Sequence, residues 1–234
     1  MPMNHRRAIL TAGWIAASLS IAACSSSPVE PASESAGGAA ATARYSVVFQ
    51  STWTVLTHPI DFPSDAHFSR LVGGTHNASV TFWSEGAPAS TGIKDMAERG
   101  RTTPLDQEVN AAISAGRAEH LLVGGAIDTT PGSVSLDFEM STAFPLVTLV
   151  SMIAPSPDWF VGVGSLALFQ DGQWIESRQI ELIPWDAGTD SGSTFRSADF
   201  VTMPFQGISR IITAPLSPTG RVTPLGTFTF TRLP

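Results

Sequence analysis

The chain has a single cysteine, Cys24, among its 234 residues. One cysteine excludes an intramolecular disulfide, and it excludes every metal site that is built from several thiolates. A metal ion bound by this protein must therefore be held by oxygen atoms or by imidazole nitrogens. This restriction directs the search for a metal site to carboxylates, carbonyls and histidines.

Charged residues are scarce as well, at 14% of the chain, and they leave a formal net charge of −7. The negative balance argues against nucleic acid as a partner, because its phosphates would be repelled. Hydrophobic residues make up 43%, which argues against a disordered chain. With 20 Gly and 17 Pro beside so few charges, the composition favours a β-rich fold with many loops.

The N-terminal apolar segment is too short to span a bilayer. It runs from Ala8 to Ala23, about 16 residues, whereas a spanning helix needs roughly 20. The basic residues Arg6 and Arg7 precede it, and small residues close it before Cys24. This pattern is typical of an export signal over residues 1–23.

The sequence Ile21-Ala22-Ala23-Cys24 resembles the lipobox of bacterial lipoproteins. The resemblance implies cleavage before Cys24 and a diacylglycerol on its thiol, which tethers a protein to the membrane without spanning it. Ser25 is not the aspartate that retains such proteins at the inner membrane, so we expect the outer membrane of a bacterial cell envelope. An ordinary signal peptide with a chance cysteine is the alternative.

The chain after the signal divides into a tether and one domain. Residues 24–44 contain the predicted lipidated cysteine followed by Ser, Ala, Pro, Gly and Glu without any aromatic residue, a composition typical of a flexible tether. Residues 45–234 have the length and the apolar content of one domain with its own core.

Most of this domain has the sequence pattern of short strands, in which β-branched, aromatic or alternating residues are separated by turn residues. The predicted strands are 45–53, 78–83, 121–123, 133–140, 146–153, 160–169, 173–176, 208–213 and 227–231. Residues 146–153 are nearly all apolar, which predicts a central buried strand. So many short strands predict an all-β fold, an antiparallel β-sandwich.

Two short helices interrupt the strand pattern. Helical spacing of Ile93, Met96 and Ala97 predicts one helix that ends at Gly100. Pro104 opens the second, with apolar residues on one side at Leu105, Val109, Ala112 and Ile113. We expect these helices to form an insertion that caps the sheet.

Two acidic loops carry the clearest chemical signal. Asp158 follows Pro155 and Pro157, and Asp186 and Asp190 lie four residues apart in a Gly-rich loop. Calcium binds six to eight oxygen atoms, several of them from carboxylates, on backbone that can wrap around the ion. The three aspartates are therefore predicted to form a calcium site. Magnesium is the competing ion, and turn-capping by the aspartates is the alternative without a metal.

Both loops also resemble those of a known family, the spondin domain of F-spondin and mindin. The resemblance rests on Ser151-Met152-Ile153-Ala154-Pro155-Ser156-Pro157-Asp158-Trp159-Phe160-Val161-Gly162-Val163 and on Pro184-Trp185-Asp186-Ala187-Gly188-Thr189-Asp190-Ser191-Gly192. Further matches are Trp53, His58-Pro59, Pro63, His67-Phe68, His76 and the segment from Gly92 to Gly100. The resemblance extends over about residues 45–215.

The resemblance implies a β-sandwich similar to C2 domains, with one calcium ion at one end, in secreted matrix and adhesion proteins. It places Asp158 at the position of a family ligand, and it adds Glu139 because the family has an acidic residue near this position. This chain lacks the thrombospondin-type repeats of animal relatives and carries a lipobox, so integrin or matrix binding does not transfer.

The sequence shows no nucleophile–base pair of the kind that hydrolases use, so we do not expect an enzyme. We expect a membrane-anchored calcium-binding lipoprotein for adhesion or for recognition of a protein or glycan ligand at the cell envelope. One alternative is a calcium-dependent hydrolase of envelope material. The other is an assembly module in which calcium is purely structural.

Overall fold

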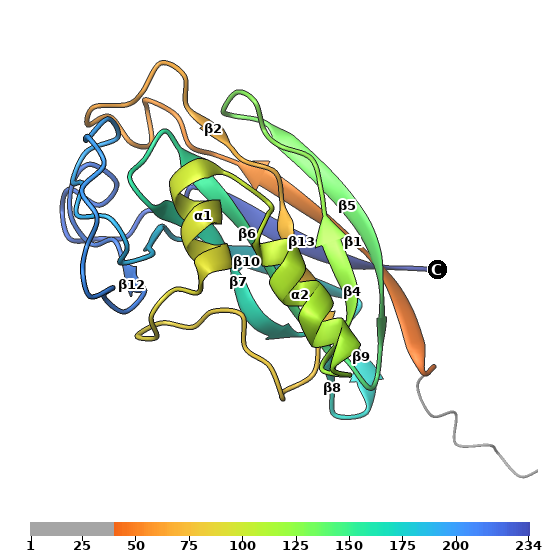
Figure 1. Ribbon diagram of the computed structural model, residues 1–234. Helices are drawn as coiled ribbons and strands as arrows, with labels where there is room; N and C mark the ends of the chain where they lie inside the picture. Colours follow the sequence, from red (N-terminus) through yellow and green to blue (C-terminus); the bar gives the residue numbers. More distant parts are fainter. Residues whose placement is uncertain (1–39) are drawn as a thin grey trace, which may run out of the picture. The chain divides into compact units, whose positions relative to one another are not determined.

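A computed structural model of the protein describes residues 40–234 (Figure 1). The predicted signal peptide, Cys24 and residues 25–39 of the predicted tether lie outside the described residues. From residue 40 onward, no helix is long and apolar enough to cross a membrane. The described chain forms two antiparallel sheets that enclose one core and two helices on the outer side of the larger sheet.

The smaller sheet has the strand order β10-β13-β1-β5. Its strands are β1 (Thr42–Ser51), β5 (Ser133–Ser141), β10 (Ser177–Glu181) and β13 (Gly226–Leu233). Tyr45, Val47 and Phe49 alternate with more exposed residues along β1 and are fully buried. The same alternation begins with buried Ala43, so β1 starts three residues before the predicted domain boundary at residue 45.

The larger sheet has the order β12-β11-β7-β6-β3-β4, with β2 paired to β6. Its strands are β2 (His67–Phe68), β3 (Val72–His76), β4 (Ala118–Val123), β6 (Leu146–Ala154), β7 (Trp159–Ala167), β11 (Trp185–Asp186) and β12 (Ser209–Arg210). A separate hairpin pairs β8 (Phe169–Gln170) with β9 (Gln173–Trp174). The apolar strand β6 lies inside this sheet, and the predicted central strand is confirmed.

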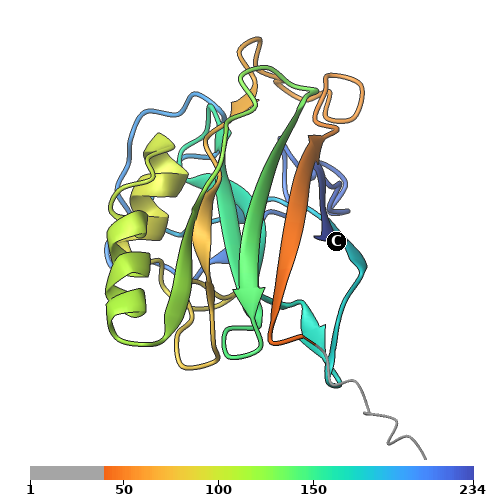
Figure 2. The same ribbon diagram turned by 90° about the vertical axis from the view of Figure 1, so that its right-hand side faces the viewer.

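The two predicted helices are also confirmed, as α1 (Thr91–Arg99) and α2 (Leu105–Ser114). Ser90 caps α1 by accepting a hydrogen bond from the Ile93 N–H, and Gly100 ends it with a φ of 63°. Figure 2 shows both helices on one side of the molecule, where they pack on β3, β4 and β6. The prediction of an all-β sandwich with two short inserted helices is therefore confirmed.

One predicted strand is wrong, and four strands of the structure were not predicted. Residues 78–83 form a loop, and their apolar alternation arises because Phe82 and Trp83 pack on the outer face of the larger sheet, against His76 and Phe160. Of these four strands, β3 is Gly-rich, β10 is short and mostly polar, and β2 and β11 have only two residues each.

The strand register brings two long loop segments to the same end of the sandwich, here called the loop end. Ser51, the last residue of β1, pairs with Gly226, and Glu181 pairs with Thr227. The segments 52–66 and 182–225 therefore both start from this end (Figure 1). The start of β1 and the first described residue, Ala40, lie at the opposite end.

Candidate metal site at the loop end

Asp158 is the most buried of the predicted ligands. It directly precedes β7, its exposed fraction is 0%, and its Oδ2 accepts three hydrogen bonds from the next acidic loop. The donors are the Thr189 N–H at 2.7 Å, the Thr189 hydroxyl at 3.1 Å and the Asp190 N–H at 3.0 Å. The Asp158 carboxylate thus holds the second acidic loop against the first.

The other oxygen of this carboxylate, Asp158 Oδ1, is buried and accepts no hydrogen bond from any described residue. Burial and the neighbouring Asp186 carboxylate together raise the pKa of Asp158 to about 6. Among residues 40–234, no lysine, arginine or histidine forms an ion pair with any of the three aspartates. A buried, uncompensated carboxylate oxygen is costly, and a bound cation is the simplest means of compensating it.

Asp186 is brought to Asp158 by the sheet, because β11 pairs with β7 so that Asp186 lies opposite Trp159. Burial raises the pKa of Asp186, and the nearby Asp190 charge also raises it. Hydrogen bonds from the Gly188 N–H and from Trp159 act in the opposite direction and lower this pKa. Gly188 has a φ of 73°, and a Cβ there would lie 2.5 Å from the Gln206 carbonyl oxygen. The tight turn between the two aspartates therefore depends on glycine.

Asp190 has a different set of contacts. Its Oδ1 accepts the Gly192 N–H and its Oδ2 accepts the Phe200 N–H, both at 2.7 Å. These bonds fold the following loop, as the turn-capping alternative expects. Each oxygen keeps a second lone pair, so Asp190 remains available to a cation beside Asp186.

Glu139 does not join the aspartates, which contradicts its prediction as a ligand. It lies in β5 of the smaller sheet, opposite Arg44 and near the end away from the loops. It is exposed because it alternates with the buried residues Phe138 and Met140. The strand that places residue 139 is not the neighbour of the strand that Asp158 precedes, which sequence spacing could not reveal.

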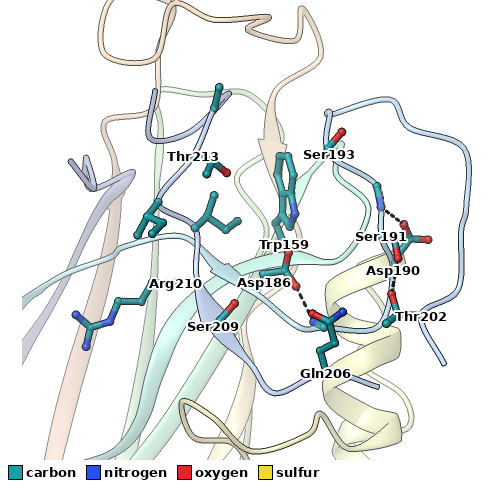
Figure 3. A pocket seen from close by; sticks show the side chains of 15 residues that line it. Trp159, Asp186, Asp190, Ser191, Ser193, Thr202, Gln206, Ser209, Arg210 and Thr213 are labelled. Carbon is teal, nitrogen blue, oxygen red and sulfur yellow. Dashed lines mark hydrogen bonds between the residues drawn. The ribbon is translucent and has the colours of Figure 1, made fainter. Parts of the chain in front are cut away.

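Asp186 and Asp190 face an open cavity of about 610 Å³ (Figure 3). Trp159 lies beside Asp186, and hydroxyl groups of Ser191, Thr202 and Ser209 line other parts of the wall. Thr189 was not among the predicted site residues, yet it is fully buried and donates hydrogen bonds from both its N–H and its hydroxyl to Asp158. Its position between Asp186 and Asp190 was the feature of the sequence that could have identified it as a site residue.

The donor set fits a hard cation such as calcium. No three acidic, histidine or cysteine side chains in the described part of the chain are grouped so that they form a metal site by themselves. Asp158, through its Oδ1 atom, and Asp186 nevertheless supply two neighbouring carboxylates. The Asp190 carboxylate is close enough to Asp186 for its charge to act on it. Calcium completes its shell with carbonyl oxygens and water, so two or three carboxylates suffice.

A family model described as Spondin_N matches residues 43–221. Spondin-2 of Homo sapiens is 37% identical over 182 residues, which cover 76% of this chain and 55% of that protein. Spondin-1 of Rattus norvegicus is 32% identical over 176 residues, which cover 73% of this chain and 22% of that protein. The chain thus spans about half the length of Spondin-2 and about a fifth of Spondin-1.

Proposed function

The chain belongs to the Spondin_N family, and from this premise we propose that it is a non-catalytic, extracellular ligand-recognition domain with a calcium site at its loop end. The main support for the calcium site is Asp158 Oδ1, because this buried carboxylate oxygen has no hydrogen-bond partner among the described residues. Asp158 and Asp186 would bind the ion directly, and Asp190 would complete the acidic set. Calcium would supply the positive charge that these carboxylates lack.

Exposed hydrophobic side chains support the recognition role. Eight large hydrophobic residues of the described chain are exposed, and all but Val48 lie in the two segments of the loop end. These seven are Val55, Leu56, Ile60, Phe200, Val201, Met203 and Ile212. Exposed apolar side chains that gather at one end of a soluble domain indicate an interaction surface.

The acidic site and this surface are joined by hydrogen bonds. Asp190 Oδ2 accepts the Phe200 N–H, and the Phe200 carbonyl accepts the Ser191 N–H. Phe200 and Met203 are 70% and 77% exposed, so the loop that presents them is anchored to the second acidic loop. A cation at the aspartates would hold this loop in one conformation and so reduce the entropy cost of binding a ligand.

The N-terminal part of the proposal concerns the cell envelope of a bacterium. We propose that Cys24 carries a lipid and that residues 25–41 connect it to the domain. Ala40 lies at the end opposite the loops, so a tether that joins the domain there leaves the loop end free for a ligand. The partner would be a protein or a glycan outside the cell membrane.

A binding measurement with loop variants tests this function. The chain is assayed against a panel of immobilised envelope proteins and glycans, in calcium and in chelator. We expect calcium-dependent binding that Phe200→Ser and Met203→Ser each weaken by roughly tenfold or more, because removing a central apolar contact costs about 1.4 kcal/mol or more. The melting midpoint should change little, since both side chains are exposed.

Val48→Ser is the matched control, because Val48 is an exposed hydrophobic residue outside the loop end. This variant should bind like the unchanged protein. Equal binding by the loop variants, or binding that chelator leaves intact, would contradict the proposed recognition surface. If calcium raises the melting midpoint while no ligand on the panel depends on the loops, the structural role of calcium in an assembly module is favoured instead.

A further inference from the structure

A second cavity, of about 570 Å³, lies along one edge of β7 and away from the acidic site. Six consecutive residues of this strand, 162–167, line it. A cavity that follows a strand for six residues is a groove, and it has the length of about 20 Å of extended chain. Its remaining walls come from the loop before α1 and from the segment around β10.

The groove exists because β7 lacks a full neighbour on this side. On this side of β7, β11 pairs with Trp159 and Phe160 alone, since the chain before Trp185 comes from β10 in the other sheet. Within residues 40–234, no strand or isolated bridge pairs with residues 161–167 on the side away from β6. The larger sheet therefore ends there with an open place for one more strand, in line with β11.

The backbone groups of this edge are available for hydrogen bonds. The Asp158 carbonyl faces β11, because it accepts the Ala187 N–H at 3.1 Å. Strand backbone groups alternate in direction, so those of Gly162 and Gly164 point to the same side. Neither glycine has a side chain that would cover the edge, and Gly164 is exposed.

Arg178 already occupies one hydrogen-bonding position of the missing strand. It extends from β10 in the smaller sheet, and its Nη1 donates to the Ala167 carbonyl at 3.3 Å. This guanidinium takes the place of a backbone N–H at one end of the groove. At the other end, Trp83 and Trp185 pack edge to face at 5.2 Å and form an apolar wall.

We propose that this groove binds an extended peptide segment of a partner protein, which adds to the larger sheet as a strand beside β7. Main-chain bonds to Gly162 and Gly164 would supply affinity, and the two tryptophans would select apolar side chains. An added strand that continues β11 runs antiparallel to β7, so an acidic residue near its N-terminal end would meet Arg178. The inference is independent of calcium and of the loop end.

The shape of β7 limits the partner to a short segment. The pairing of β6 with β7 shifts its register near Thr148, and Ser165 has a φ of 56°. Such a bulge bends the edge and discourages pairing with long flat strands. The segment must also lack proline where it faces Gly162 and Gly164, because proline has no N–H to donate.

Selection of binding peptides on the full chain tests the proposal. A displayed library of random twelve-residue peptides is selected on the protein, and the enriched peptides are synthesised for affinity measurements. We expect proline-free runs of alternating apolar and polar residues. N-methylation of alternate peptide residues should weaken binding tenfold or more, and binding should slow hydrogen exchange at the amides of Gly162 and Gly164.

Ser84→Trp fills the groove from an exposed position on its wall, and Ser135→Trp places the same side chain on an exposed position of β5. Binding should fall at least tenfold in the first variant and stay unchanged in the second, with both melting midpoints intact. Failure to enrich any peptide, or equal affinity for both variants, would overturn the proposal. So would a dimer that Ser84→Trp dissociates, because the occupant would then be a second copy of the chain.

Discussion

Replacing Asp158 by Asn is expected to stabilise the metal-free chain while it strongly weakens calcium binding. The pKa of about 6 is roughly two units above the ordinary value of 3.8, so ionisation of Asp158 at pH 7 costs the fold about 3 kcal/mol. An Asn carries no charge, can still accept the Thr189 and Asp190 N–H bonds, and can donate toward Asp186. We expect the free energy of unfolding in chelator to rise by about 1 to 3 kcal/mol.

The same substitution should weaken calcium binding by a factor of about 100 or more, because loss of one buried charged partner costs about 3 kcal/mol or more. The stabilisation in chelator also depends on pH. The stability that the unchanged chain gains from protonated Asp158 is fully present below about pH 4 and is lost as pH rises through about 6. The greater stability of the Asn variant should therefore develop between these two pH values.

Asp137→Asn is the matched control for this prediction, because Asp137 is exposed in the middle of β5, outside the segments of the loop end. Chemical denaturation in chelator and calorimetric titration with calcium measure the two effects. The account is wrong at Asp158 if the Asn variant is less stable than the unchanged chain in chelator, or if it binds calcium equally well.

Gly73→Ala should strongly destabilise the domain. A Cβ at Gly73 would lie 1.9 Å from the carbonyl oxygen of Thr148 in the neighbouring strand β6. The clash is with backbone in the middle of the larger sheet, so no side-chain movement relieves it. Overpacking a core costs about 1 to 3 kcal/mol and sometimes more, and we expect a loss of about 3 kcal/mol or more. The melting midpoint would fall by roughly 6 °C or more.

Gly116→Ala is the comparison, because Gly116 has a φ of 67° and open space around its Cβ position. It should lose only about 1 kcal/mol, from the left-handed backbone conformation alone. Thermal unfolding of both variants separates steric overlap from backbone preference. A Gly73→Ala variant as stable as Gly116→Ala would mean that β3 and β6 are not packed as closely as described.

The loops of the candidate site were more predictable than some of the strands that support them. Asp158, Asp186 and Asp190 stand in segments rich in proline and glycine, and the chemistry of calcium requires such carboxylates on bendable backbone. Their meeting depends on the pairing of β7 with β11, which covers only two residues of each strand. A pairing this short leaves little periodic pattern in the sequence.

The wrong strand and the wrong ligand have the same cause, which is tertiary packing. Apolar and polar residues alternate along residues 78–83 because Phe82 and Trp83 cover a sheet face. Strand β3 was not predicted because Gly73 and Gly74 have low strand propensity. These glycines allow the neighbouring strands to approach closely, since a Cβ at Gly74 would lie 2.9 Å from the His120 carbonyl oxygen. Glu139 was predicted from the family resemblance, but the sandwich assigns its strand to the other sheet.

The central claim is that the buried carboxylate at the loop end binds calcium, and thermal unfolding of the metal-free chain with increasing calcium tests it most directly. At a calcium concentration of 100 times the dissociation constant, one site stabilises the fold by about 2.7 kcal/mol. The melting midpoint should then rise by roughly 5 to 10 °C, and magnesium should give a smaller shift. An unchanged midpoint with either ion, in protein shown by mass spectrometry to be metal-free, would contradict the account.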